Sequence, residues 1–177
     1  MEVSVNERPT RADTLLTVAF TLAQRSTCTR LHVGAIAALD GRILATGYNG
    51  APAGTPHCTH PPSEICQRSV HAEANVVAYA ARHGVSLAGS EVYATDSPCY
   101  TCACLLINAG ISSVVFVRKY RDESGLRLLA DVGVKVYHVN LVNEEQPPSE
   151  DSNPYEVRLE ELLPRGDDSQ AQEPGIH

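Results

Sequence analysis

The sequence predicts an α/β fold with a mixed five-stranded sheet covered by helices. Strand-like and helix-like segments alternate between residues 69 and 139, which is the order of βαβ units with parallel strands. Two further strand-like segments joined by Asp40-Gly41 precede that series, as in a β-hairpin. The hairpin adds an antiparallel strand, and we expect the last two strands to be parallel because a helix separates them.

The chain has 177 residues, of which 43% are hydrophobic, enough for one domain with its own core. We expect a flexible arm over residues 1–9 and a folded domain over residues 10–142. Residues 143–177 are rich in Glu, Pro and Ser and predict an acidic, mostly disordered tail. A candidate short helix lies within the tail over residues 155–163.

The first half of the domain predicts one helix and the hairpin. Apolar residues at near-helical spacing and an acidic first turn at Asp13 predict a helix over residues 10–25. The hairpin strands are expected over residues 33–39 and 43–46. A loop rich in Gly, Pro, Cys and His follows over residues 47–67. Loops of this length are usually functional or tied down.

Helices and strands alternate in the second half. Each expected helix is followed by a glycine, which commonly ends a helix in the left-handed conformation. The helices are expected over residues 69–83, 99–109 and 123–132. The strands are expected over residues 91–95, 114–117 and 134–139.

The composition indicates which classes of partner to expect. The net charge of −7 argues against a nucleic-acid partner, because proteins that grip nucleic acid carry a basic face. The sequence contains no apolar run of about 20 residues, so we expect no membrane partner. The polar start is unlike a signal peptide, and six cysteines without an export signal read as metal ligands or buried thiols. We therefore expect a cytoplasmic protein.

Two short motifs predict a metal site. His71-Ala72-Glu73 opens one expected helix, and Pro98-Cys99-Tyr100-Thr101-Cys102 opens another. Cys99 and Cys102 are one helical turn apart, so their sulfurs point the same way. One imidazole and two thiolates are three ligands for Zn²⁺, which leaves a fourth position for a water whose pKa zinc lowers to about 7. Glu73 is either a fourth, structural ligand or a general acid and base beside that water.

The pattern H-x-E followed by P-C-x-x-C is the established signature of zinc deaminases. With these residues the chain resembles the cytidine/deoxycytidylate deaminase family. The segment Gly47-Tyr48-Asn49-Gly50-Ala51-Pro52 is similar to the corresponding loop of deoxycytidylate (dCMP) deaminases, and residues 28–35 are similar to the segment around their first strand. The resemblance covers residues 10–139 and implies a three-layer cytidine-deaminase-like fold for a zinc-dependent deaminase domain.

The resemblance implies hydrolytic deamination of dCMP to dUMP and ammonia, which supplies dUMP for thymidylate synthesis. It assigns Glu73 as the general acid and base. Three alternatives stay open: deamination of a 5-substituted dCMP, deamination of tRNA adenosine, and a non-catalytic zinc protein that senses dNTPs.

Substrate contacts are also implied by the resemblance. Asn49 matches a residue that binds a sugar hydroxyl, although Asn-Gly is also a strong turn signal. Tyr120 matches an aromatic residue that flanks sugar or base, and Ala72 is small enough to lie under a ring. A monophosphate needs cations, and the nearby candidates are Arg30, Arg118, Lys119 and Arg121, with Arg30 and Arg121 preferred.

Effectors and assembly follow from the resemblance alone. Family members form homohexamers that dCTP activates, with Mg²⁺, and dTTP inhibits. Tyr48 and Gly50 are the candidate contacts for such an effector.

A second zinc site is also implied. Cys28, Cys58 and Cys66 match cysteines that hold a structural zinc in bacterial and phage relatives, where another cysteine completes the site. This chain lacks that cysteine, and we expect His60 to replace it, with His57 as the alternative. Four N and S ligands close a zinc site and make it structural. The competing interpretation is three unrelated free cysteines.

Overall fold

The computed structural model describes residues 9–139. The expected arm before residue 9, and the tail with its candidate helix, lie outside the described residues. The helices are α1 (Arg11–Ala23), α2 (Ala72–His83), α3 (Tyr100–Asn108) and α4 (Ser124–Asp131). The strands are β1 (Gly34–Leu39), β2 (Arg42–Tyr48), β3 (Glu91–Asp96), β4 (Ser113–Arg118) and β5 (Lys135–His138).

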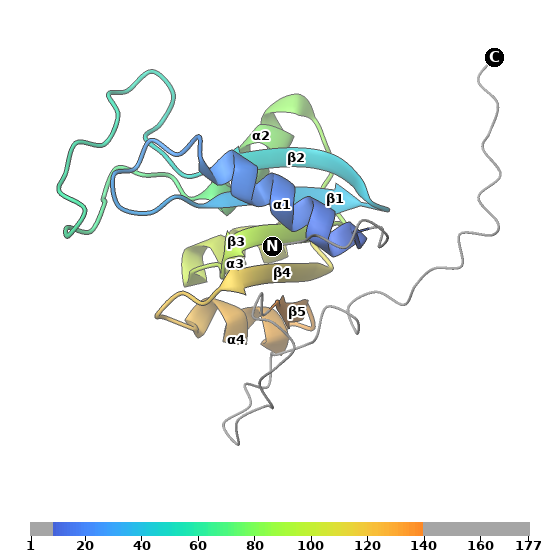
Figure 1. Ribbon diagram of the computed structural model, residues 1–177. Coiled ribbons are helices and arrows are strands. Elements are labelled where there is room, and N and C mark those ends of the chain that lie inside the picture. The colour runs from blue at the N-terminus through green and yellow to red at the C-terminus, as the bar shows by residue number, and fades with distance from the viewer. Residues whose placement is uncertain (1–8, 140–177) are drawn as a thin grey trace, which may run out of the picture.

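The five strands form one mixed sheet in the order β2-β1-β3-β4-β5. Strand β1 pairs antiparallel with β2 and with β3, whereas β3, β4 and β5 are parallel. Helix α1 covers one face of the sheet, and α2, α3 and α4 cover the other (Figure 1). The three-layer fold with a parallel final strand pair is thereby confirmed.

Two apolar clusters hold the layers together. The larger lies between the sheet and helices α2, α3 and α4, and its largest members include Phe116, Leu106 and Leu126, none of them solvent-accessible. The smaller joins Leu15 and Leu16 of α1 to the opposite face of the sheet. Strands β1, β3 and β4 lie between the two clusters and are therefore buried on both faces over most of their length.

Two glycines let helix backbones touch the sheet directly. A Cβ on Gly34 of β1 would overlap the carbonyl oxygen of Ala19 in α1. A Cβ on Gly47 of β2 would overlap the carbonyl oxygen of Ala72, the first residue of α2. The start of β1 and the end of β2 are therefore fixed by backbone contact with helices from both layers.

Helix α2 begins three residues later than the sequence pattern predicts. Val70 and Gly50 exchange two backbone hydrogen bonds, of 2.8 and 3.0 Å, in an isolated antiparallel bridge. That bridge holds the chain extended, and His71 remains extended with φ −70° and ψ 155°. The helix therefore starts at Ala72, which makes His71 its N-cap.

Candidate active site

His71, Cys99 and Cys102 converge on one point. The Nδ1 atom of His71 lies 3.4 Å from Sγ of Cys99 and 3.5 Å from Sγ of Cys102. Tetrahedral zinc bonds of about 2.1 Å to nitrogen and 2.3 Å to sulfur would place nitrogen and sulfur about 3.6 Å apart. The three donor atoms therefore fit a zinc ion in both chemistry and spacing.

Both helix starts supply ligands. His71 is the N-cap of α2 and Cys99 is the N-cap of α3, and neither side chain caps its own helix. A hydrogen bond from the Cys102 thiol, and then one from His71, lower the pKa of Cys99 to about 4. The same thiolate raises the pKa of His71. A thiolate is thus available at neutral pH, as a metal ligand must be.

Glu73 lies in the first turn of α2 and its side chain is buried, with 3% of the residue exposed. Burial raises its pKa to about 7, against an ordinary value of 4.5. A carboxyl group with this pKa gains and loses protons readily at neutral pH, which is the property of a general acid and base. Glu73 is two residues from His71 in the sequence and belongs to the same site.

A pocket opens directly in front of this group. The pocket is lined by four of the substrate contacts that the family resemblance implied: Asn49, Ala72, Tyr120 and Arg30. The candidate metal ligands His71 and Cys99 line it as well, as does Glu73. Arg121 is exposed and does not line it; its guanidinium lies 5.9 Å from the centre of the Tyr120 ring.

Asn49 has a structural role beside any ligand role. Its Oδ1 accepts a hydrogen bond of 2.9 Å from the backbone N–H of Val33, and its Nδ2 donates one of 2.8 Å to the carbonyl of Leu31. One amide hydrogen and one oxygen lone pair remain. Asn49 therefore orients the segment before β1 and still has groups to offer a ligand.

The two candidate effector contacts flank Asn49. Tyr48 accepts a 2.8 Å hydrogen bond at its carbonyl from Asn75, and Gly50 belongs to the bridge with Val70. Their roles toward an effector stay predictions.

Several pocket residues were not predicted from the sequence. Asp96 and Ser97 line the pocket from the end of β3, Ile65 lines it from the long loop, and Ser69 lines it from the segment just before α2. Asp96 and Ser97 directly precede Pro98-Cys99, so proximity to a ligand motif was the available signal. Ile65 carried no signal, although it is 63% exposed and apolar.

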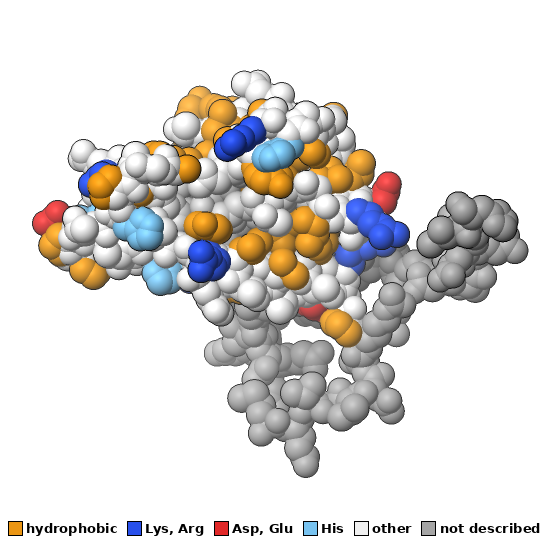
Figure 2. Space-filling view, turned by 90° about the horizontal axis from the view of Figure 1, so that it is seen from above, with side chains coloured by type: hydrophobic (Ala, Val, Ile, Leu, Met, Phe, Trp, Pro, Cys, Tyr) orange, Lys and Arg blue, Asp and Glu red, His pale blue; other side chains and the backbone are white. Residues whose placement is uncertain are grey.

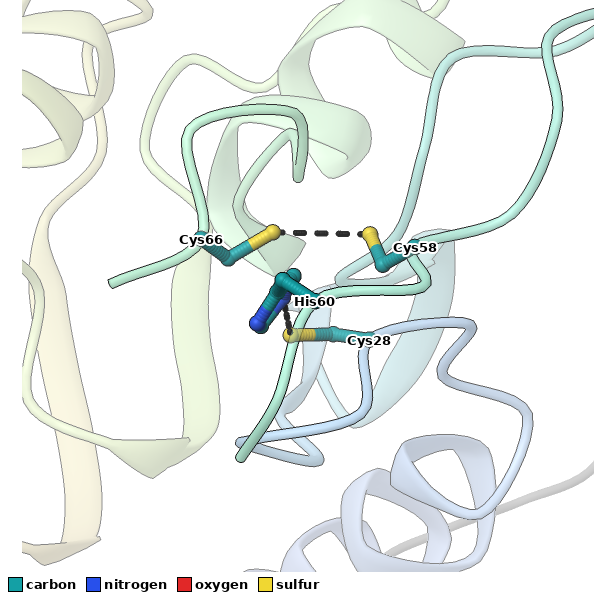
Figure 3. Close-up of side chains that lie close together, drawn as sticks. All are labelled: Cys28, Cys58, His60 and Cys66. Carbon is teal, nitrogen blue, oxygen red and sulfur yellow. Dashed lines mark hydrogen bonds between the residues drawn. The ribbon is translucent and has the colours of Figure 1, made fainter. Parts of the chain in front are cut away.

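The second cysteine cluster also converges. Cys28 follows α1, and Cys58, His60 and Cys66 come from the long loop, with the four side chains pointing toward one another (Figure 3). Their ligand atoms lie within 4.8 Å of one another. Sγ of Cys58 is 3.4 Å from Sγ of Cys66, and Nε2 of His60 is 3.8 Å from Sγ of Cys28. His57, the alternative fourth ligand, is outside this group.

His60 is oriented as a metal ligand. Its Nδ1 is 2.9 Å from the carbonyl oxygen of Pro61, which fixes the ring and leaves Nε2 facing Cys28. A backbone carbonyl on the other ring nitrogen is the usual support of a metal-bound histidine. Three sulfurs and one nitrogen fit a closed zinc site. Cys28 and Cys66 also line the pocket, so the two clusters share a wall.

The described surface and pocket carry few cations. On the face shown in Figure 2, Lys and Arg side chains stand apart rather than forming a stripe. Among the described pocket-lining residues, Arg30 is the cation. Within residues 9–139, no helix combines the length and apolarity needed to cross a membrane.

Three residues that could hold a metal ion and a buried carboxylate, arranged around a pocket, are the arrangement expected of a metal-dependent enzyme. The model of the cytidine and deoxycytidylate deaminase zinc-binding region matches residues 9–118. The chain therefore belongs to the cytidine and deoxycytidylate deaminase family.

Named relatives lie in the same family. ComE operon protein 2 of Bacillus subtilis (strain 168) is 39% identical over 125 residues, covering 68% of this chain and 66% of the relative. Deoxycytidylate deaminase of Mycobacterium phage D29 is 37% identical over 127 residues, covering 63% of this chain and 98% of the relative. The crystal structure of dCMP deaminase from cyanophage S-TIM5 in complex with dCMP and dUMP superposes with a TM-score of 0.70 at 32% identity, covering 75% of this chain and 99% of that chain.

Proposed function

We propose that this protein is a zinc-dependent dCMP deaminase that converts dCMP and water into dUMP and ammonia and supplies dUMP for thymidylate synthesis. The observation that carries the proposal is the buried Glu73 beside His71, Cys99 and Cys102, at a pocket whose described lining holds one cation, Arg30. Relatives named deoxycytidylate deaminase, from phages and from Saccharomyces cerevisiae, support the choice of substrate.

His71, Cys99 and Cys102 would hold the catalytic zinc. When bound, zinc supplies a water of lowered pKa as the nucleophile. Glu73 accepts a proton from the attacking water and delivers one to N3 of the cytosine ring while the new C4–O bond forms. It then takes the proton of the new C4 hydroxyl and delivers it to the exocyclic amine, so the C4–N bond breaks, the C4=O bond of the product forms and ammonia leaves. A pKa near 7 suits one carboxyl group for both directions of transfer.

The pocket walls fit a nucleotide. Ala72, with no exposed surface and no bulk beyond Cβ, leaves room for the pyrimidine ring next to Glu73. Asn49 offers its remaining amide hydrogen and lone pair to the sugar hydroxyl, and Tyr120 flanks the sugar or base. Arg30 is our candidate for the phosphate, because a guanidinium can contact two phosphate oxygens at once. Arg121 is a secondary candidate from outside the pocket.

The test is ammonia release from dCMP, CMP, deoxycytidine, dCTP and 5-methyl-dCMP, measured side by side. We expect rapid turnover of dCMP. A Glu73→Ala variant should keep its zinc and lose at least about 100-fold in rate, the low end of general acid–base catalysis. Turnover of 5-methyl-dCMP in preference to dCMP would move the assignment to that substrate. Inactivity on all five nucleotides would reject it.

We also propose that Cys28, Cys58, His60 and Cys66 hold a second, structural zinc. The donor set and the Pro61 contact to His60 support this assignment. Such a metal would tie the long loop to the segment after α1. Metal analysis should give two zinc ions per chain, and a single zinc in the wild-type protein would reject the second site.

Assembly and regulation are proposed from the family. We expect a cytoplasmic homohexamer whose activity rises with dCTP and Mg²⁺ and falls with dTTP, with Tyr48 and Gly50 at the effector site. Light scattering of the purified protein measures the subunit count. Rates with and without each nucleotide measure the regulation, and a flat response to both would reject it.

A further inference from the structure

Arg118, the last residue of β4, joins three separate segments at the rim of the pocket. Its Nη2 donates a hydrogen bond of 2.7 Å to Oδ2 of Asp96 at the end of β3. The same atom donates one of 2.9 Å to the backbone carbonyl of His32, in the segment before β1. Because β3 and β4 are parallel neighbours, Asp96 and Arg118 stand side by side in the register of the sheet.

Asp96 is itself held in place. Oγ1 of Thr95 donates a hydrogen bond of 2.6 Å to Oδ2 of Asp96, and the backbone N–H of Gly34 donates one of 3.2 Å to the same Thr95 hydroxyl. The Asp96 side chain is 17% exposed and the Arg118 side chain 50% exposed. One carboxylate oxygen therefore anchors an arginine, a threonine and, through that threonine, the start of β1.

The segment that these bonds hold is a wall of the pocket. Arg30, Leu31 and Val33 line the pocket, and His32 between them is bonded to Arg118. Asn49 holds Leu31 and Val33 through its own two hydrogen bonds. Three consecutive residues of this wall are thus fixed by two side chains from separate parts of the chain.

We propose that Arg118, acting with Asp96, is a positioning residue that fixes the wall of residues 30–33 and thereby sets the affinity for the nucleotide. The inference rests on the proposed function. Arg118 is not among the described residues that line the pocket. Its charge is already matched by Asp96, so it acts on the substrate through Arg30, Leu31 and Val33 rather than as a phosphate ligand.

The direction of the KM change in Asp96→Asn distinguishes a positioning role of Arg118 from a phosphate-binding role. If Arg118 positions the wall, Asp96→Asn and Arg118→Gln both loosen it. Each should raise KM for dCMP by roughly five- to tenfold, a value kept small because the pair is partly solvent-exposed. The kcat of Arg118→Gln should change by less than about twofold, because Arg118 does not line the pocket. Asp96→Asn is tested by its KM alone, since the Asp96 carboxylate lines the pocket and helps to raise the pKa of Glu73. If Arg118 instead bound the phosphate, Asp96→Asn would release it and remove a negative charge, so KM would fall.

The experiment measures kcat and KM for dCMP in the full-length zinc enzyme. The variants are Arg118→Gln, Asp96→Asn and the double variant, with the exposed Arg42→Gln at the hairpin as the matched control. A paired action predicts that the double variant is no worse than the worse single variant. A lower KM in Asp96→Asn, or fully multiplicative effects in the double variant, would overturn the proposal.

Amide hydrogen exchange gives a readout that needs no substrate. Peptides covering residues 29–36 should exchange at least about fivefold faster in Arg118→Gln than in the wild type, while peptides from α3 stay unchanged. Unchanged exchange in residues 29–36 would overturn the inference. A wild-type enzyme that is inactive on dCMP would reject the proposed function, and the exchange experiment would still decide whether Arg118 holds the wall.

Discussion

Replacing Gly125 with alanine should displace Cys99, a proposed zinc ligand that lies far from Gly125 in the sequence. Gly125 is buried at the start of α4, where its backbone packs on the segment that leads into α3. A Cβ there would overlap the carbonyl oxygen of Pro98 and lie 2.8 Å from the carbonyl carbon of Cys99. Ordinary carbon–carbon contacts are about 3.5–4.0 Å, so α4 or the Pro98–Cys99 segment must move by about 1 Å.

The magnitude follows from that displacement. Overpacking of this kind costs about 1–3 kcal/mol of unfolding free energy. A shift of about 1 Å at a catalytic group can reduce the rate by about 100-fold, and here the displaced residue is Cys99 itself. We expect Gly125→Ala to lose zinc to a chelator faster than the wild type, and to lose activity with it.

Gly133→Ala is the matched control at the other end of the same helix. Gly133 has a φ of +82°, and a Cβ there would meet none of the described atoms within 4 Å apart from its chain neighbours. Alanine at this position costs about 1–2 kcal/mol through its left-handed backbone alone. Urea unfolding should therefore show both variants destabilised, while zinc release and kcat change in Gly125→Ala only. Wild-type zinc retention and kcat in Gly125→Ala would refute the reasoning.

Cys28→Ser should lower the zinc content from two ions to one per chain and reduce stability more than it changes the choice among substrates; an unchanged zinc-to-protein ratio would reject its role as a ligand. In zinc-stripped protein, burial raises the pKa of Glu73 from 4.5 to about 7, so the folded state holds this proton more tightly than the unfolded state. The unfolding free energy of the wild type should therefore fall relative to Glu73→Gln as pH rises from about 4.5 to about 7, by up to about 3 kcal/mol, and parallel pH curves from urea titrations would contradict it. Thr10→Ala disrupts the capping box of α1, in which Thr10 and Asp13 exchange hydrogen bonds of 3.1 and 3.0 Å. The unfolding free energy should fall by about 1 kcal/mol. An unchanged urea midpoint would contradict this prediction.

The fold was predictable because its signals are local. Hairpin turn residues, glycines after helices and alternating patterns each act within a few residues, and together they indicate the element order and the parallel final strands. The start of α2 was not predictable in the same way. The bridge between Gly50 and Val70 joins residues far apart in the sequence, and it overrides the helical pattern around residue 70.

The convergence of the candidate metal ligands was predictable because zinc demands particular residue types at particular spacings. The other residues that line the pocket follow no such rule of residue type and spacing. Arg118 counted as one of four candidate phosphate cations, since a sequence shows a charge but not its partner, and Asp96 became visible as that partner only through the pairing of β3 with β4. Ile65 lines the pocket from the long loop, a placement that no local pattern indicates.

The contacts of Gly34 and Gly47 with the helices limit which residues could be exchanged to alter the substrate range of this enzyme. Where Gly34 meets α1 and Gly47 meets α2, main chain lies on main chain, and no side chain there can be shortened to make room. Larger nucleotides would have to be accommodated elsewhere, at residues such as Ile65 and Tyr120, which line the pocket from outside the strands and whose side chains can be exchanged for smaller ones. A search for altered substrate range should therefore vary the loops and leave the strand ends untouched.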